Sequence, residues 1–251
     1  MNRVRPSIGL KAATRGSKAA RRSRGPATSD PTRDKLLDVA GRIFADRGYR
    51  AATIRQICVA AGANVAAVNY HFGDKLGLYT EVVRQSARLA EFQAAQTALD
   101  LSAPPEEILR AVIRARLHSL FRGDRPDWSF RIMAHELAQP TPALRRLVNK
   151  AGQPVFHRLL GLIGGMIGLP AEDESTRLCA ISLLGQIMVY ALAGPLVTAI
   201  WPEFEMTPKQ VDRIADHIAD FSLSYIQNFR SKNSARSIQR TKRKVIPRAS
   251  K

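Results

Sequence analysis

Apolar residues recur at every third or fourth position along most of the chain, and no segment alternates strictly between apolar and polar residues. This spacing places apolar side chains on one face of an α-helix, whereas a half-buried strand needs alternation. The pattern therefore predicts an all-α protein. The first helix opens at Asp30-Pro31-Thr32 and ends at Gly48, and its apolar stripe consists of Leu36, Leu37, Ala40, Ile43 and Phe44.

Two short helices and a longer one are expected next. Residues 53–56, Thr-Ile-Arg-Gln, match a capping box, in which the Thr53 side chain accepts from the backbone of Gln56 and the Gln56 side chain bonds back. The helix that starts there ends at Gly62, Asn64 can cap the following helix, and Asp74 can cap a long fourth one. The first three helices would form a small tri-helical unit.

Further apolar stripes predict helices over residues 105–121, 128–138, from 142 into the 160s, 174–193 and 208–229. Residues 178–201 contain no charge and are long enough to span a membrane. Against a span, the segment contains Ser182, Gln186 and Thr198, and Gly194-Pro195 interrupts it. A helix buried on all sides by its own protein or by a partner subunit is equally apolar. We favour the buried helix.

The stretch from Ala60 to Phe72 has too few long apolar residues for a core helix and too few charges for an ordinary exposed one. Two short helices joined by a turn that contains glycine form a helix-turn-helix, whose second helix enters the major groove of DNA. That helix must be slim enough to approach the bases and must carry hydrogen-bonding groups. Residues 65–71 meet both conditions.

The candidate DNA contacts differ in chemistry. Asn69 can bond N6 and N7 of adenine, while Ala66 and Ala67 are small enough to touch thymine methyl groups. Tyr70 and His71 suit phosphate oxygens. Each residue alone has a plain structural reading, as a cap, a helix former or a packed aromatic, but the set together favours DNA binding. The predicted DNA-binding residues are Thr53, Arg55, Asn64, Val65, Ala66, Ala67, Asn69, Tyr70, His71 and Lys75.

The charge of the chain is concentrated at its two ends. Lys and Arg number 39 against 21 Asp and Glu, which gives a net charge of +18. Residues 1–33 carry nine basic side chains and one acidic one, and residues 230–251 carry nine basic and no acidic ones. We expect both ends to be disordered in isolation and suited to polyanions such as nucleic acid or an acidic membrane surface. A solvated tail with only incidental binding is the plainer alternative.

No catalytic or metal-binding constellation is evident. Cys58 and Cys179 lie far apart outside any C-x-x-C pair, which is typical of reduced thiols in a cytoplasmic protein. His135-Glu136 lacks the second histidine of a zinc-protease motif, because position 139 is Gln. Residues 161–168 lack the G-x-G start and the preceding strand of a dinucleotide site. We therefore expect no enzyme, no metal and no cofactor.

A pattern of residues between positions 31 and 80 resembles the DNA-binding domain of the tetracycline-repressor (TetR) family. The matching positions are Ala40, Phe44, Gly48, Tyr49, Thr53-Ile54-Arg55-Gln56-Ile57, Ala61-Gly62, Tyr70-His71-Phe72 and Lys75. The resemblance implies an all-helical homodimer with a small N-terminal DNA-binding domain and a larger C-terminal domain that binds an effector and dimerises. Residues 131–144 also resemble a C-terminal subtype of the family, whereas neither tail belongs to the resemblance.

Four segments are expected on this basis: a disordered basic arm (1–29), a TetR-type helix-turn-helix domain (30–90), an effector-binding and dimerisation domain (91–229) and a disordered basic tail (230–251). Helices 174–193 and 208–229 would pair with their copies in a four-helix bundle. An apolar effector cavity with a few polar groups could be lined by residues that are as readily core residues: Trp128, Phe130, Met133, His135, Glu136, Met188 and Tyr190.

These observations favour a sequence-specific DNA-binding transcriptional regulator, a repressor that a small, largely apolar effector releases from a palindromic double-stranded operator. Such a homodimer would act in the cytoplasm, associated with the nucleoid when bound to DNA, and without a membrane. The alternative is an architectural or non-specific nucleic-acid-binding protein that acts mainly through its basic tails. A membrane-anchored protein is the third hypothesis.

Overall fold

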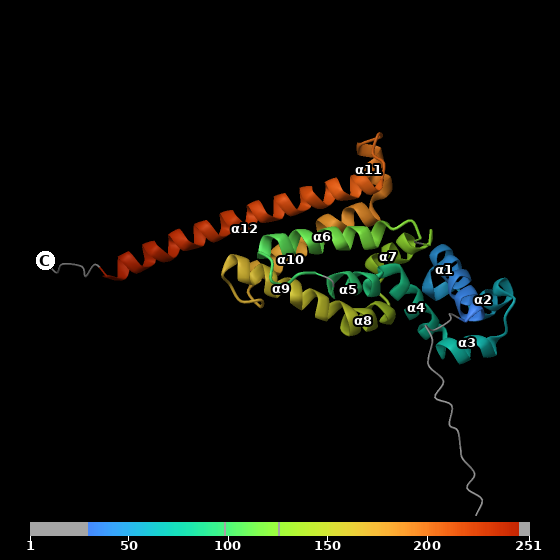
Figure 1. Ribbon diagram of the computed structural model, residues 1–251. Coiled ribbons are helices and arrows are strands. Elements are labelled where there is room, and N and C mark those ends of the chain that lie inside the picture. The colour runs from blue at the N-terminus through green and yellow to red at the C-terminus, as the bar shows by residue number, and fades with distance from the viewer. Residues whose placement is uncertain (1–29, 98, 125, 246–251) are drawn as a thin grey trace, which may run out of the picture. The chain divides into compact units, whose positions relative to one another are not determined.

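The computed structural model describes residues 30–97, 99–124 and 126–245, with side chains throughout except at 90, 91 and 234–245. Within these ranges the chain is helical and contains no strand, which confirms the all-α prediction (Figure 1). The expected basic arm, residues 1–29, lies outside the described residues, and so do the last six residues of the expected tail.

The first four helices are α1 (Pro31–Ala51), α2 (Ile54–Ala61), α3 (Val65–Phe72) and α4 (Lys75–Ala87). The ends of these helices are determined locally, by glycines and by capping residues that act on residues three or four positions away. Gly48 leaves the helical conformation inside α1 with a φ of 73°, and Gly62 ends α2 in the left-handed region with a φ of 62°. Both angles are strained for residues with a Cβ. The chain can therefore change direction where the sequence predicts.

Three predicted helix caps are confirmed. The backbone N–H of Gln56 donates to Thr53 Oγ1 (3.2 Å), and Gln56 Oε1 accepts from the Thr53 N–H (3.0 Å). Asn64 Oδ1 accepts from the N–H of Ala67 (2.8 Å) at the start of α3. Asp74 Oδ1 accepts from the N–H at position 77 (2.6 Å) at the start of α4. Each cap satisfies an N–H group that the helix itself leaves without a partner.

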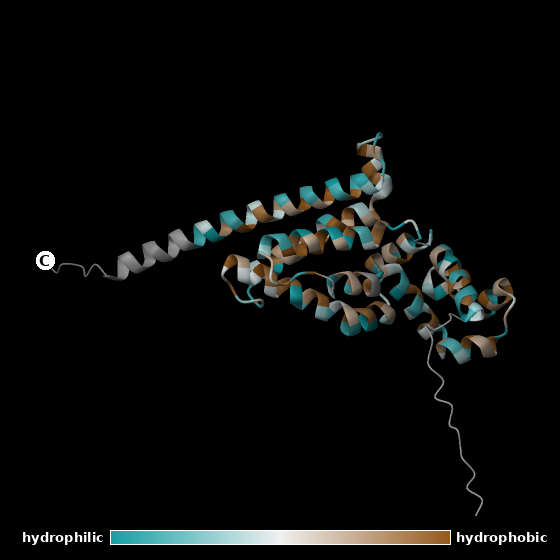
Figure 2. Ribbon diagram, in the orientation of Figure 1, coloured by the Kyte–Doolittle hydropathy of each residue, from teal (hydrophilic) through white to brown (hydrophobic). Residues whose placement is uncertain are grey.

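The remaining elements are α5 (Leu89–Thr97), α6 (Pro105–Phe121), α7 (Ser129–Ala138), α8 (Pro142–Leu147), the π-helical turn η1 (Val148–Gly152), α9 (Gln153–Ile167), α10 (Glu174–Leu192), α11 (Gly194–Ile200) and α12 (Pro208–Val245). In Figure 1, α12 runs along α6. Figure 2 shows hydrophilic and hydrophobic residues alternating around α1, as an amphipathic helix requires.

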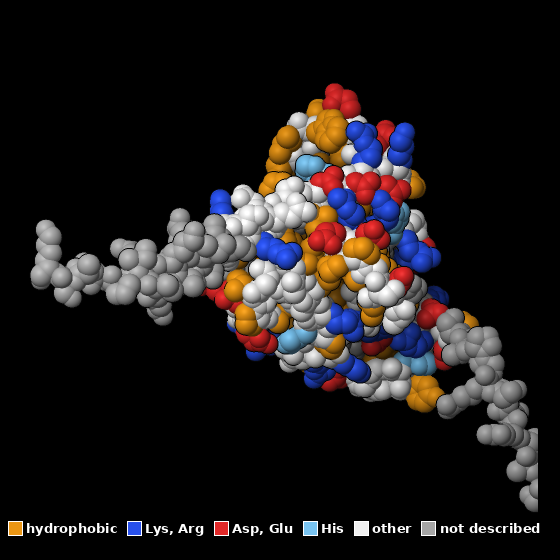
Figure 3. All heavy atoms as spheres, turned by 60° about the vertical axis from the view of Figure 1, so that its left-hand side comes forward, with side chains coloured by type: hydrophobic (Ala, Val, Ile, Leu, Met, Phe, Trp, Pro, Cys, Tyr) orange, Lys and Arg blue, Asp and Glu red, His pale blue; other side chains and the backbone are white. Residues whose placement is uncertain are grey.

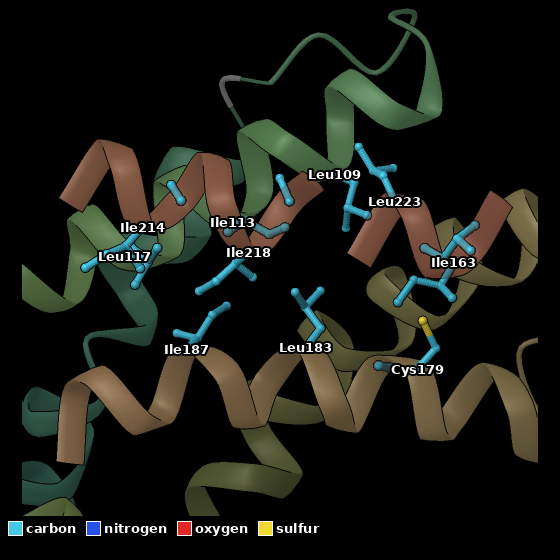
Figure 4. Packing of buried hydrophobic residues seen from close by; sticks show 14 of the residues in the cluster. Leu109, Ile113, Leu117, Ile163, Cys179, Leu183, Ile187, Ile214, Ile218 and Leu223 are labelled. Carbon is cyan, nitrogen blue, oxygen red and sulfur yellow. The ribbon is translucent and has the colours of Figure 1, made fainter. Parts of the chain in front are cut away.

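Two hydrophobic clusters hold the helices together. The C-terminal cluster joins α6, α9, α10 and α12; Figure 4 shows Leu183 and Ile187 of α10 pointing toward Ile218 of α12. The N-terminal cluster joins α1 to α4, and it also takes in Trp128, which directly precedes α7, Ile132 of α7 and two residues of α8. This second cluster crosses the domain boundary expected at residue 90. The helices expected to read DNA thus share a core with α7 and α8.

The last helix differs from expectation. Residues 230–245, expected to be disordered, continue α12 to Val245. From Lys209 to Ile246 the chain contains neither Gly nor Pro, and Pro247 is the first residue that cannot continue the helix. Like charges oppose a buried core but do not forbid a solvated helix. The expectation of disorder is therefore corrected over this range.

Candidate nucleic-acid interface

Helix α3 buries little of its own surface. Val68 is its one buried residue, and it packs into the N-terminal cluster. Around Val68, Val65 is 48% exposed and Tyr70 is 84% exposed, and Ala66 and Asn69 are also exposed. The Tyr70 ring contacts the ring of the neighbouring His71 but remains largely open to solvent. The outer face of α3 is consequently available to a partner.

The exposed face of α3 carries hydrogen-bonding groups in usable positions. Asn64 uses its side-chain oxygen to cap the helix, so its NH2 group points outward as a donor. The side-chain amide of Asn69 makes no hydrogen bond with another described residue. An amide without a partner can offer the donor and acceptor pair that matches the edge of adenine. The predicted roles of these two asparagines are compatible with the geometry.

The predicted phosphate contacts Lys75 and His71 are less open. Lys75 Nζ donates to the carbonyl of Arg50 (3.3 Å) and lies 4.7 Å from the ring centre of Tyr49. Partial burial lowers the pKa of Lys75, because desolvation disfavours the charged form. The His71 ring is half-buried, 4.9 Å from the Tyr70 ring. Lys75 therefore also braces the junction between α1 and α4.

A shallow groove of about 420 Å³ lies beside the start of α2. Its lining includes Thr53 and Arg55, both predicted to bind DNA, and Arg47, which the sequence reasoning missed. All three side chains are exposed. Arg47 directly precedes Gly48, the residue that turns the chain toward α2. That position was the available signal, because a basic side chain beside a helix N-terminus adds to the attraction that the free N–H groups there have for an anion such as phosphate.

The two halves of the chain match known families separately. Residues 36–82 match the bacterial regulatory proteins of the tetR family. Residues 105–226 match the C-terminal domain of the HTH-type transcriptional dual regulator CecR. The CecR protein of Shigella flexneri is 30% identical over 189 residues, which cover 70% of this chain and 83% of that relative. The chain belongs to the TetR family. It is a DNA-binding transcriptional regulator with an N-terminal helix-turn-helix.

Solved TetR-type structures share the fold. A putative transcriptional regulator from Pseudomonas aeruginosa PAO1 has a TM-score of 0.57 at 18% identity, covering 78% of this chain and 93% of the other. The structure of AibR in complex with isovaleryl coenzyme A and operator DNA has a TM-score of 0.53 at 22% identity, covering 76% and 97%. At these identities the likeness establishes the fold alone.

The seven residues expected to line an effector cavity do not form one set in this TetR-family protein. Trp128 is fully buried and Met133 packs beside it in the N-terminal cluster, whereas Phe130, Met188 and Tyr190 pack against the C-terminal cluster. A cavity lined by all seven stays a prediction. Trp128 and Phe130 are two positions apart, and side chains at that separation point to different sides of a helix.

Glu136, another of the seven, is fully buried at the end of α7. Its carboxyl oxygens accept from the backbone N–H of Thr141 (3.0 Å) and from the Thr141 hydroxyl (2.8 Å). Burial raises the pKa of Tyr79, and the hydrogen bond to Glu136 raises it further. Glu136 therefore links α7 and α8 to α4. His135 is half-buried, and its Nδ1 has no hydrogen-bond partner among the described residues.

The junction between α4 and α5 contains two buried arginines. Arg88 adopts a φ of 47°, rare for a residue other than glycine, and its guanidinium pairs with Asp124 (3.1 Å). Arg116 of α6 donates to the carbonyl of Ala87 (2.9 Å) at the end of α4. The Arg88 hydrogen bond lowers the pKa of Asp124. These contacts tie the end of α4 to α6 and to the loop before α7.

An apolar surface remains uncovered on α10 and α12. Six large side chains on these helices are between 42% and 61% exposed: Leu178, Ile181, Leu184, Val189, Phe221 and Tyr225. We call them the α10–α12 face. Helix α10 is long and apolar enough to cross a membrane, but Leu183 and Ile187 on its inner side belong to the C-terminal cluster. The expectation that this helix is buried all round does not hold within one chain.

Hydrophobic side chains also gather near α11. Leu196, Ile200 and Trp201 are 58%, 77% and 49% exposed, and Figure 3 shows orange side chains at the end of the molecule where Figure 1 places α11. Acidic and basic side chains lie beside one another next to this region in Figure 3. Apolar patches of this extent are uncommon on monomeric proteins and mark interaction surfaces.

Proposed function

We propose that this chain is a homodimeric repressor that holds a palindromic operator with α3 and leaves it when a small molecule binds. The observation that carries the proposal is the outer face of α3, where Asn69 has an amide without a partner and Tyr70 is 84% exposed. An exposed tyrosine and an amide without a hydrogen-bond partner contribute little to the stability of the folded chain. Its chemistry suits the major groove.

The α10–α12 face supports a homodimer. Two-fold pairing of this face would bury its six side chains in a four-helix bundle, and an interface built from a largely apolar surface is typical of obligate dimers. The two-fold axis would also relate two copies of α3. Paired recognition helices read inverted repeats whose half-sites are about one helical turn, or a multiple of it, apart.

We assign base reading to Asn69 and Asn64, with Val65, Ala66 and Ala67 close to the base edges. The proposed phosphate contacts lie around this set: Thr53, Arg55, Tyr70, His71, Lys75 and, in addition, Arg47. Phosphate contacts fix register without carrying sequence information, whereas base contacts specify the sequence.

The proposed effector is a small, largely apolar molecule. A ligand shifts a protein between two states only if it binds one of them better. Because α7 and α8 share a core with α1 and α4, a ligand that moves either helix would reorient α3. The structure of AibR holds isovaleryl coenzyme A together with operator DNA, so acyl thioesters are suitable first compounds. An effector would raise the melting temperature and weaken operator binding.

Two substitutions separate the proposed roles. Asn69→Ala should relax base preference, lowering the affinity for the operator by about 1–3 kcal/mol with little change on unrelated DNA. Lys75→Ala should weaken binding to all DNA alike and reduce the slope of log affinity against log salt by about one. Gel-shift titrations over a salt series measure both quantities.

Asn149→Ala is the matched control, because Asn149 is an exposed asparagine on η1. It should leave both readouts unchanged. Identical behaviour of the Asn69 and Lys75 variants would contradict the assignment. If DNA of any sequence displaced the probe equally well, the alternative of non-specific binding through the basic tails would be correct. We further propose that the protein acts in the cytoplasm on nucleoid DNA and catalyses no reaction.

A further inference from the structure

Helix α10 has a glycine in the middle of its outward side. Leu183 and Ile187 of α10 point toward Ile218 of α12 in the C-terminal cluster (Figure 4). Gly185 lies midway between these two inward residues, and side chains two positions apart point to roughly opposite sides of a helix. A Cβ added at Gly185 would meet open space. Position 185 therefore faces away from the core and leaves a gap in the α10–α12 face.

A groove of about 400 Å³ lies at this gap. Its lining residues come from both helices of the face: Gly185, Gln186, Val189 and Tyr190 of α10, with His217 and Ile218 of α12. Val189 is half-exposed and Ile218 is buried, so the groove runs from the surface down to a residue of the C-terminal cluster. The missing side chain at position 185 widens it. We call this groove the Gly185 notch.

Phe221 protrudes from the same face beside the notch. It follows His217, which lines the notch, by four residues, or about 6 Å along α12. At 61% exposure, Phe221 is the most exposed of the six side chains of the α10–α12 face. The ring of Tyr225 packs against Phe229, with 6.0 Å between the ring centres, whereas Phe221 contacts no other ring within the described residues. Phe221 is therefore available to fill a hollow in a partner.

A protruding side chain and a hollow on one face are what a two-fold interface requires. Both partners of such an interface use the same patch, so a protrusion on one copy must meet a hollow in the same patch of the other. Phe221 and the Gly185 notch satisfy this condition. A face with protrusions alone would leave voids when it paired with its copy, and close packing does not tolerate voids.

The charges around the notch permit two copies to approach each other. Like charges on a face repel when that face meets its own copy. Helix α10 has no charged residue from Leu178 to Leu192. On α12, Asp216 and Asp220 both pair with arginines of α6. Arg213 lies beyond the notch, about 12 Å along the helix from Phe221. The face between the notch and Phe221 is thus nearly neutral.

The apolar area of this face also suits a second copy. Its six large side chains are each about half-exposed and present on the order of 500 Å² of surface in each copy. Each partner of a stable complex contributes roughly 800 Å². Pairing through this face would therefore provide more than half of a standard interface from apolar side chains alone.

We propose that the Phe221 ring of each subunit inserts into the Gly185 notch of its partner. The proposal rests on the proposed function, which pairs the α10–α12 faces, and it names the contact that fixes how they pair. Because Phe221 and the notch lie close together on each copy, the two contacts lie on either side of the two-fold axis, near the centre of the interface. Buried aromatic side chains at the centre of an interface contribute a large share of its affinity.

Two single substitutions test this contact in full-length protein that carries one of two dyes at its N-terminus. Gly185→Leu fills the notch from within its own subunit, and Phe221→Ala removes the protruding ring. Each should raise the dissociation constant of the homodimer by about ten- to a hundredfold, as measured by energy transfer between subunits. Gly161→Leu is the matched control, because an added Cβ at this exposed position of α9 also meets open space. It should leave the constant unchanged.

A mixture of the two variants separates this contact from a general disturbance of the interface. In the mixed dimer the filled notch of one subunit faces the truncated side chain of the other, and the second site is as in the wild type. The mixed dimer should bind within about threefold of the wild type and exceed the statistical half of an equal mixture. Recovered affinity also shows that both variants are folded. Gly161→Leu mixed with Phe221→Ala should stay at the statistical half.

An unchanged dissociation constant for Gly185→Leu would show that the partner does not occupy the notch. It would overturn the proposal and leave the proposed dimer in place. A statistical mixture of two weakened variants would show that Phe221 contacts another part of the partner, which also overturns the proposal. A monomeric wild type would instead contradict the proposed homodimer itself. The two failures are thus distinguishable.

Discussion

Glu136 joins helices α7 and α8 to α4 through its side-chain carboxyl group. Its fully buried carboxyl group receives hydrogen bonds from the Thr141 backbone, the Thr141 hydroxyl and Tyr79. The Thr141 hydroxyl in turn accepts from the N–H of Ala143 and caps α8. Three donors converge on one acidic group, so its removal deprives all three of this acceptor.

Glu136→Ala should lower the free energy of unfolding by about 2–4 kcal/mol, the combined effect of unsatisfied donors and a small cavity. Urea unfolding monitored by circular dichroism, at one fixed protein concentration, measures this loss of stability. Glu172→Ala, which removes an exposed carboxyl group, is the control and should change stability by less than about 0.5 kcal/mol. A similarly small change in the free energy of unfolding of both variants would show that the hydrogen bonds of Glu136 do not stabilise the fold.

Residues that act on near neighbours were predictable from the sequence, whereas residues that act across the fold were not. Thr53, Asn64 and Asp74 cap their helices through bonds to the third residue along the chain. By contrast, Trp128 was expected in an effector cavity, and its ring nitrogen instead donates to Asp38 of α1 (3.1 Å). No local pattern around Trp128 encodes that contact.

At the scale of elements, α7 is fixed to α1 by a close approach of ring and backbone. Trp128 lies against Gly41, where an added Cβ would overlap its ring. Only glycine permits this approach. Salt bridges from Arg42 to Asp127 (3.1 Å) and from Arg131 to Asp46 (2.7 Å) flank the contact, but exposed pairs of this kind contribute little. The fit of Trp128 against Gly41 therefore fixes the position of α7.

Gly41→Ala should destabilise the protein by about 1–3 kcal/mol, because the Trp128 ring must move in a packed core. Gly161→Ala is the matched control. Gly161 lies within a helix and an added Cβ there meets open space, so alanine should stabilise the protein by up to about 1 kcal/mol. Thermal unfolding of both variants gives opposite shifts. Equal shifts would contradict the packing argument.

The sequence predicted where helices occur better than it predicted how long they are. Helix α12 is held against α6 by its buried side and by pairs of charged residues, including Arg114–Asp216 and His118–Asp212. Charge repulsion predicts a disordered tail for its basic continuation, but this segment also lacks the Gly and Pro residues that would end the helix. Composition predicts whether a segment can bury a hydrophobic core, but helix-breaking residues such as Gly and Pro determine where a helix ends.

At the scale of the whole molecule, the α10–α12 face decides whether one α3 or two act together. Leu183 and Ile187 of α10 face inward, while Ile181 and Leu184 face outward. One side of α10 thus builds the core of the chain, and the other side is the one that the proposed dimer would cover. The sequence predicted an apolar helix, but it could not tell a membrane span from a subunit interface. The placement of Leu183 and Ile187 in the C-terminal cluster favours the subunit interface that we propose.

Ile181→Glu should convert the proposed dimer into monomers, since a charge in an apolar interface is costly without a partner. Leu137→Glu is the control, because Leu137 on α7 and Ile181 are both 56% exposed. Sedimentation velocity should show wild type and Leu137→Glu as dimers and Ile181→Glu as monomers. If all three proteins were dimers, the interface would lie elsewhere. If all three were monomers, the proposed dimer would be excluded.

Selection of bound fragments from random DNA tests the central claim most directly, namely that two copies of α3 read one operator. The wild type is predicted to enrich an inverted repeat whose half-sites are about one helical turn, or a multiple of it, apart. Asn69→Ala should enrich the same spacing with at least one degenerate position in each half-site. Fragments without a shared sequence, or with a single unrepeated site, would contradict the account.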